Sequence, residues 1–182
     1  MTVQRTKIEI IENLNGSILD IGGGGEGVIG QIYGKKVIAI DNRQEELDEA
    51  PDCCQKELMD ATELLFPDES FDQVTFFYSL MYMTEEIQHR AICEAARVLK
   101  VNGSINIWDC DIHAAYPKPF VVDLDIRSGN KSIHTSYGIV KKDKQSSDSI
   151  TQALKRAGLK LVFLREEDGH FHIQCAKEEV NS

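Results

Sequence analysis

The chain has 182 residues, 42% of them hydrophobic, which is enough for one domain with a full core. Its formal net charge of −10 repels phosphate backbones and argues against a nucleic-acid partner. No apolar run approaches the roughly 20 residues that span a bilayer, no secretory leader is recognisable, and the five cysteines lack the spacing of a disulfide frame or metal site. We expect one cytoplasmic domain, residues 1–182, with reduced thiols, no membrane association and no metal.

The first half of the chain alternates short apolar runs with helical segments. Four runs predict strands, at residues 17–21, 36–40, 57–59 and 71–78. Helical segments are expected between them at residues 28–33 and 44–50. The run at 71–78 carries little charge and many β-branched and aromatic residues, as a central strand buried on both faces should.

A longer helix and a fifth strand follow. Thr84 is the expected N-cap, and apolar residues recur at helical spacing up to Leu99, before Asn102 and Gly103. The next apolar run, at residues 104–108, predicts a strand that ends at Asp109. Alternation of strands and helices implies parallel strands with right-handed crossovers, so the fold class is α/β with a doubly wound sheet.

The last third of the chain interrupts this alternation. Apolar residues fall at every second position in 120–126 and 133–139, with a Ser-Gly-Asn turn between them, which predicts a β-hairpin inserted at about residues 118–142. A helix at 148–157 and strands at 159–164 and 170–176 complete the chain. The connection between those two strands is too short for a parallel crossover, so the last strand is expected to be antiparallel. Residues 1–16 are expected to be a short N-terminal segment.

Four consecutive glycines follow the first predicted strand. Gly22, Gly24 and Gly27 fit the pattern G-x-G-x-x-G at a turn from strand to helix, where the backbone can approach a ligand closely. Asp41 lies 19 residues after Gly22, at the end of the next strand, where a carboxylate can accept hydrogen bonds from both hydroxyls of a ribose. The pattern predicts a nucleoside ligand.

The segment Leu19-Asp20-Ile21-Gly22-Gly23-Gly24 resembles the first motif of the class I S-adenosylmethionine-dependent methyltransferases, in particular the small-molecule type. The resemblance covers nearly the whole chain and implies a Rossmann-like, mostly parallel seven-stranded sheet whose last strand is antiparallel. It also implies S-adenosylmethionine as the cofactor. The acid two places before the first glycine, Asp20, would help to hold the methionyl ammonium group, whereas dinucleotide dehydrogenases usually have an apolar residue there.

The same resemblance assigns further cofactor contacts. Asp41 and the neighbouring Asn42 would hold the ribose, and Asp60 with Ala61 would lie at the adenine. The segment after the fourth strand, residues 78–83, would pass near the transferred methyl group, and Tyr78 is its expected cofactor contact because an aromatic ring attracts a sulfonium. Glu26 departs from the family, which usually has its third glycine there.

The methyl acceptor leaves a weaker signal, because in-line transfer from a sulfonium requires alignment more than one particular catalytic side chain. Asp109 and His113 follow the fifth strand, where the family often places groups that face the substrate, although acids and histidines are also common in exposed loops. His170 and His172 share one strand face, but two ligands do not make a metal site.

Three classes of function fit these features. We favour a methyltransferase acting on a small-molecule acceptor, with the inserted hairpin as a substrate cover or, equally, as a homodimer contact. A nucleoside-binding protein without catalysis is the second hypothesis. A nicotinamide-dependent oxidoreductase is the third, and Asp20 disfavours it.

Overall fold

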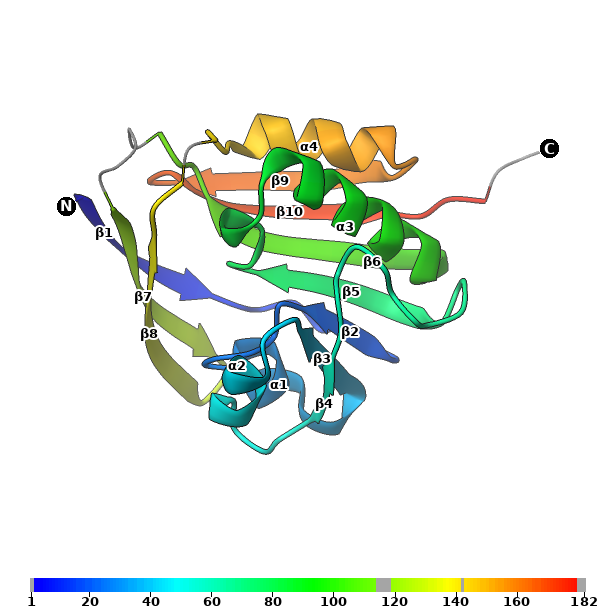
Figure 1. Cartoon of the computed structure of the whole chain (residues 1–182), viewed down its shortest axis with the longest axis horizontal. Coiled ribbons are helices and arrows are strands. Elements are labelled where there is room, and N and C mark those ends of the chain that lie inside the picture. Colours follow the sequence, from blue (N-terminus) through cyan, green and yellow to red (C-terminus); the bar gives the residue numbers. More distant parts are fainter. Residues whose placement is uncertain (1, 114–118, 142, 180–182) are drawn as a thin grey trace.

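The computed structural model describes residues 2–113, 119–141 and 143–179. Its main feature is a seven-stranded sheet in the order β4-β3-β2-β5-β6-β10-β9 (Figure 1). The strands are β2 (Ile18–Ile21), β3 (Val37–Asp41), β4 (Gln55–Leu58), β5 (Phe71–Phe77), β6 (Leu99–Cys110), β9 (Lys160–Glu167) and β10 (His170–Ala176). Pairing is parallel from β4 to β6, and β10 runs antiparallel to both of its neighbours. The predicted α/β class, the parallel core and the antiparallel last strand are confirmed.

Two layers cover the sheet. The helices α3 (Glu85–Val98) and α4 (Ser147–Arg156) pack on one face, where Ala91, Ile92 and Leu154 join Leu19, Val74 and Ile107 of the strands in one core cluster (Figure 1). On the opposite face α1 (Val28–Tyr33) shares a second cluster with residues of the inserted hairpin. The short helix α2 (Gln44–Glu49) contacts β3 and β4. Short 3-10 turns lie at Gly34–Lys36 and Leu80–Tyr82.

The inserted hairpin forms as predicted, from β7 (Phe120–Ser128) and β8 (Lys131–Ile139) in antiparallel register. The expected insertion boundaries at residues 118 and 142 lie outside the described residues. Its inward side chains Val122, Leu124 and Ile126 are buried at 0–1% exposure against the second core cluster. The hairpin therefore covers part of this face of the seven-stranded sheet. In a purely alternating α/β fold, crossover helices cover that face.

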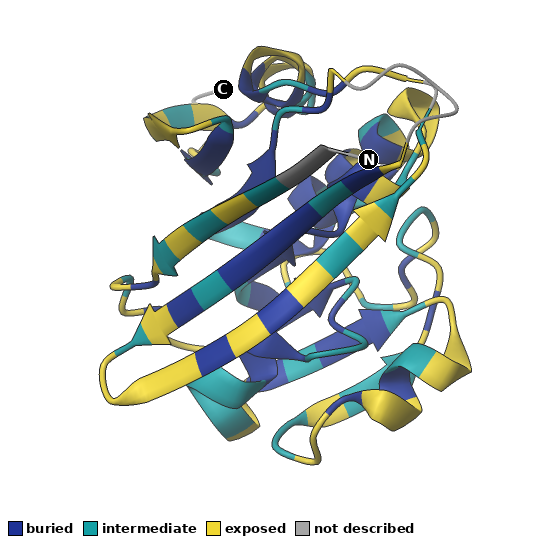
Figure 2. Cartoon of the chain, turned by 90° about the vertical axis from the view of Figure 1, so that its left-hand side faces the viewer, coloured by how far each residue is buried: buried dark blue, intermediate teal, exposed yellow. Residues whose placement is uncertain are grey.

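The N-terminal segment is a strand, which the sequence analysis missed. β1 (Thr2–Glu9) pairs in parallel with β7 and completes a second sheet in the order β1-β7-β8. In Figure 2, β7 runs between β1 and β8 and carries most of the buried residues, while exposed residues alternate along β8. Along β1 the exposed Arg5, Lys7 and Glu9 alternate with half-buried residues, a period of two that marks a strand with one face on the protein.

Two predicted boundaries in the middle of the chain are corrected. α3 ends at Val98, and β6 begins at once with Leu99, so Asn102 lies inside the strand region with a left-handed φ of 64° rather than stopping a helix. β6 also continues to Cys110, which puts Asp109 inside the strand instead of in the loop after it. β6 pairs with β10 from His170↔Cys110 to Ala176↔Ser104, and this ladder includes the two extra residues Asp109 and Cys110.

Candidate functional site

A cavity of about 560 Å³ opens at the carboxyl ends of the parallel strands. The residues that follow or end four of them line it: Gly22 after β2, Asp41 at β3, Asp60 after β4 and Tyr78 after β5. The strand order changes direction between β2 and β5, and open α/β sheets bind ligands at such a switch point. The volume lies in the range of small-molecule and cofactor sites, about 300–1,000 Å³.

The glycine loop forms the floor of the cavity. The backbone N–H groups of Gly22 and Gly23 donate to the carbonyl of Ile40, at 2.9 and 3.0 Å, which ties the loop to β3. Gly22 has a left-handed φ of +76°, and a Cβ there would collide with the side chain of Ser79. A Cβ at Gly24 would lie 2.5 Å from Cβ of Glu46 and 2.8 Å from Oδ2 of Asp41. Only glycine fits these two positions.

The Asp41 carboxylate lies at the rim of this loop. Its Oδ2 accepts from the Gly24 backbone N–H at 3.3 Å, and its Oδ1 accepts from the Arg43 backbone N–H at 3.0 Å. The side chain is thus held in one orientation at the cavity, beside Asn42, which also lines it. The carboxylate therefore lies where it could accept hydrogen bonds from a ligand in the cavity.

Asp60 and Ala61 line the cavity beyond β4. Oδ1 of Asp60 accepts two hydrogen bonds from Thr62, from its backbone N–H and its hydroxyl, both at 2.8 Å. These bonds lower the pKa of Asp60, so the carboxylate is ionised at neutral pH. A fixed acceptor at this place suits the amino group of an adenine.

Asp20 lies beneath the glycine loop and is not among the described residues that line the cavity. It is 2% exposed, and the hydroxyl of Thr75 donates to its Oδ1 at 2.6 Å. Its Oδ2 lies where a Cβ of Gly23 would stand. Burial raises the pKa of Asp20 to about 7, against the lowering effect of the Thr75 hydrogen bond. The predicted contact of Asp20 with the ammonium group is a direct one, whereas in the structure the glycine loop lies between Asp20 and the cavity.

The end of the cavity away from Asp60 is aromatic. Tyr78, Tyr82 and Tyr137 line it, and the rings of Tyr78 and Tyr137 are stacked with their centroids 5.8 Å apart. Tyr78 has a left-handed φ of 48°, and its hydroxyl shares a 2.7 Å hydrogen bond with Nδ1 of His170. Burial raises the pKa of all three phenols, that of Tyr82 to about 12, so they are neutral at pH 7.

Sequence reasoning identified Tyr78 but missed most of this aromatic end. Residues 78–83 were predicted to pass near the transferred methyl group with Tyr78 as the one expected contact, and Tyr137 and Gly138 were predicted only as part of the hairpin. Tyr82, Met83, Tyr137 and Gly138 all line the cavity. The sequence did contain a signal for Tyr137. Side chains alternate between the two faces of a strand, so Tyr137 lies on the same face of β8 as the buried Ile133 and Thr135.

The two proposed catalytic candidates are not brought to the cavity. Asp109 is fully buried, and its carboxylate accepts from the backbone N–H of Met81 at 3.2 Å and from the Gln145 side chain at 2.7 Å. Burial raises the pKa of Asp109 to about 6. These bonds hold the carboxylate inside the protein. It is buried there because β6 continues through Asp109 to Cys110. His113 is exposed and does not line the described cavity.

His170 and His172 lie together on β10 and line a second, smaller cavity of about 170 Å³. His172 stacks on Trp108, with centroids 4.3 Å apart, and shares a 3.0 Å hydrogen bond with Oδ1 of Asn106. Within the described residues, no group of three or more His, Cys, Asp or Glu is arranged to hold a metal ion.

Among the helices of the described part of the chain, none has the length and apolar character of a membrane-spanning segment.

Comparisons with known proteins agree with this geometry. A family model described as a methyltransferase domain matches residues 19–107, the segment that carries the glycine loop, Asp41, Asp60 and Tyr78. No curated protein sequence matches the chain significantly.

Many solved structures share the fold. A methyltransferase dependent on S-adenosylmethionine from Methanosarcina mazei is 18% identical, with a TM-score of 0.65 over 92% of this chain and 95% of its own. One from Mesorhizobium loti is 15% identical, with a TM-score of 0.62 over 88% of this chain and 90% of its own. The glycopeptide N-methyltransferase MtfA, solved with S-adenosylmethionine, is 12% identical, with a TM-score of 0.62 over 91% of this chain and 89% of its own.

The family match and the cavity at the strand ends lead to the same assignment. Residues 19–107 match the methyltransferase-domain model, and the chain has the fold of methyltransferases that depend on S-adenosylmethionine.

Proposed function

We propose that the protein methylates a small-molecule acceptor, which binds at the aromatic end of the cavity beneath the β7–β8 hairpin. The observation that carries this proposal is that Tyr137 and Gly138 of the hairpin line the same cavity as Gly22, Asp41 and Asp60. One enclosed space thus has a polar end suited to a nucleoside and an aromatic end suited to a second molecule. The hairpin serves as the substrate cover, rather than as a homodimer contact.

The residues at the polar end fit the cofactor. Gly22 and Gly24 leave room for close approach, Asp41 offers a carboxylate to the ribose hydroxyls with Asn42 beside it, and Asp60 with Ala61 faces the adenine. Asp20 lies beneath the loop, and a methionyl ammonium group above it would favour the ionised form of its carboxyl group. The acids suit a cofactor that carries an ammonium and a sulfonium but no pyrophosphate, since acids would repel a pyrophosphate.

When bound, S-adenosylmethionine supplies an electrophilic methyl group on its sulfonium, and the acceptor displaces it in line. The chain contributes alignment and exclusion of water. Tyr78 and Tyr137 form a stacked wall, and an aromatic face near a sulfonium adds roughly 0.5–2 kcal/mol of cation–π attraction. Tyr82 also lines the cavity and is 52% exposed. The overall charge of −10 further favours a small acceptor over nucleic acid.

The cofactor half of the proposal is tested by calorimetry with the full-length chain. S-adenosylmethionine and S-adenosylhomocysteine should bind with one site per chain, and NAD should not. Binding of NAD in preference to both adenosyl ligands would contradict the assignment of the polar end.

The acceptor half is tested with methyl-labelled cofactor and a broad set of metabolites, nucleic acids and proteins. Label should appear in a small molecule. Tyr137→Ala should then raise the KM for that acceptor while leaving the affinity for S-adenosylhomocysteine within about twofold. His134→Ala is the matched control, because His134 lies on the same strand but is exposed and bonds to Asp125 at 2.9 Å. Labelling of nucleic acid alone, or equal effects of both substitutions, would refute the proposal.

A further inference from the structure

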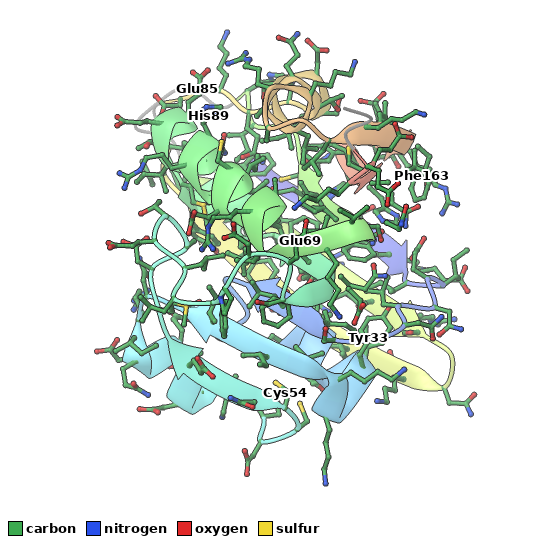
Figure 3. The ribbon with its side chains drawn as sticks, turned by 90° about the vertical axis from the view of Figure 1, so that its right-hand side faces the viewer. Tyr33, Cys54, Glu69, Glu85, His89 and Phe163 are labelled. Carbon is green, nitrogen blue, oxygen red and sulfur yellow. The ribbon has the colours of Figure 1, made fainter. Side chains whose placement is uncertain are left out.

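Two adjacent cysteines, Cys53 and Cys54, lie in a loop that the methyl-transfer site does not use. This cysteine loop (residues 50–54) joins α2 to β4. Both cysteines are free and half-buried, and both sulfur atoms face α1. The position that a Cβ of Gly30 would take is 2.6 Å from Sγ of Cys54 and 3.5 Å from Sγ of Cys53. Both side chains are partly exposed to solvent, and Figure 3 labels Cys54 in the lower part of the molecule.

The cysteine loop is packed against the segment that carries the glycine loop. A Cβ at Gly27 would lie 3.3 Å from Cβ of Ala50 and 3.5 Å from Cδ of Pro51. The Cys53 N–H donates to the Pro51 carbonyl at 2.9 Å, which holds the thiols close to that contact. Because Gly27 and Gly30 belong to the end of the glycine loop and to α1, any group inserted between the cysteines and α1 must displace one or the other.

The geometry favours a ligand that needs two sulfur atoms and no more. Zinc in structural sites takes four ligands, and the described residues offer no third His, Cys, Asp or Glu for a metal cluster here. Both sulfur atoms lie within 3.5 Å of one point, the position that a Cβ of Gly30 would take, so the two thiols face a common centre. A trivalent arsenic atom with one organic substituent has two bonds left to form, which two thiols complete. Thiol sulfur is the soft ligand that such a centre prefers.

We propose that Cys53 and Cys54 together bind a mono-organic trivalent arsenical, and that the occupied pair weakens cofactor binding by displacing α1 and the glycine loop. With phenylarsine oxide the reaction balances without an oxidant: two S–As bonds form, the As–O bond breaks, and the two thiol protons leave with the oxygen as water. Burial, with Cys53 and Asp20 nearby, raises the pKa of the Cys54 thiol to about 11. The thiol is therefore protonated at neutral pH, and its proton is one of the two that leave in the water molecule. Binding of the arsenical does not depend on the proposed function. Its effect on cofactor affinity does depend on the assigned cofactor site.

The site itself is tested by intact mass spectrometry on the reduced, full-length protein. Phenylarsine oxide is added with an excess of a monothiol, which removes adducts held by one sulfur. The wild type should gain the mass of one phenylarsine oxide less one water, and a small dithiol should reverse the gain. Cys53→Ser and Cys54→Ser should each abolish it, whereas Cys93→Ser, which removes an exposed single cysteine, should retain it. No adduct on the wild type, or an adduct on either serine variant of the pair, would overturn the site.

The coupling is tested by titrating treated and untreated protein with S-adenosylhomocysteine. We expect the dissociation constant to rise about tenfold or more, the change produced by 1.4 kcal/mol of lost binding energy. Phenylarsine oxide should leave the affinity of Cys53→Ser unchanged, which excludes effects at other thiols. An adduct that forms without altering the affinity would overturn the coupling. Failure of the untreated wild type to bind S-adenosylhomocysteine would instead refute the cofactor assignment, and the mass measurement would still decide the site.

Discussion

Replacing Asp20 by asparagine should change the pH dependence of stability. Asp20 is 2% exposed, and burial raises its pKa from 3.8 to about 7. Because the folded-state pKa is raised, Asp20 favours folding most below pH 4, and this advantage is lost as the pH rises to about 7. The slope between these limits is about 1.4 kcal/mol per pH unit, so on the order of 2 kcal/mol should be lost between pH 5 and 7. Asparagine keeps the shape and does not titrate.

The assay is urea unfolding of wild type and Asp20→Asn at half-unit steps from pH 5 to 8.5. The free energy of unfolding of the variant relative to the wild type should rise with pH and level off near pH 7, with unchanged m-values. Asp109→Asn is the matched control, since the pKa of the buried Asp109 is raised only to about 6 and its difference curve should level off one unit lower. Parallel pH curves for wild type and Asp20→Asn would refute the argument that burial keeps Asp20 protonated.

The same variant tests the predicted role of Asp20 in cofactor binding. A cationic amine above the glycine loop would lower the pKa of Asp20, so the affinity of the wild type for S-adenosylhomocysteine should increase as the pH rises toward 7. The increase should be absent in Asp20→Asn. An identical increase in the variant would assign it to another group and leave Asp20 with a structural role beneath Gly23.

Three further predictions follow from single contacts. Asp41→Ala should weaken S-adenosylhomocysteine binding by about 1.5–3 kcal/mol, the value of hydrogen bonds to a charged group, measured by calorimetry on a variant with an unchanged circular dichroism spectrum; unaltered affinity would contradict the ribose assignment. Gly22→Ala should lose more stability than Gly34→Ala: both glycines have a positive φ, but only at Gly22 does the added Cβ meet Ser79, while Gly34 faces open space. Equal losses in thermal or urea unfolding would exclude the steric contact. Thr84→Ala should cost about 1 kcal/mol of stability by removing the N-cap of α3 without changing cofactor affinity, which separates global stability from the site.

Local sequence chemistry determined the cofactor end of the site. A turn made of glycines after the first predicted strand leaves its backbone accessible to a ligand. The acids Asp41 and Asp60 lie at or just after the ends of the next two strands. Parallel strands bring their carboxyl ends to one edge of the sheet, so the order of these elements was enough to gather Gly22, Asp41, Asp60 and Tyr78 at one cavity. The period of two between 120 and 139 likewise predicted the hairpin.

Only the tertiary structure decided what the hairpin and the N-terminus do, and which acids face the cavity. Pairing of β1 with β7 joins residues more than a hundred positions apart, and no local pattern encodes such a partner. Asp109 has the residue type of a catalytic base, but the length of β6 and its pairing with β10 turn the carboxylate into the protein. Tyr137 reaches the cavity because the hairpin folds back over the sheet. Side-chain type and period are local properties of the chain, whereas burial and orientation are set by the elements packed around each residue.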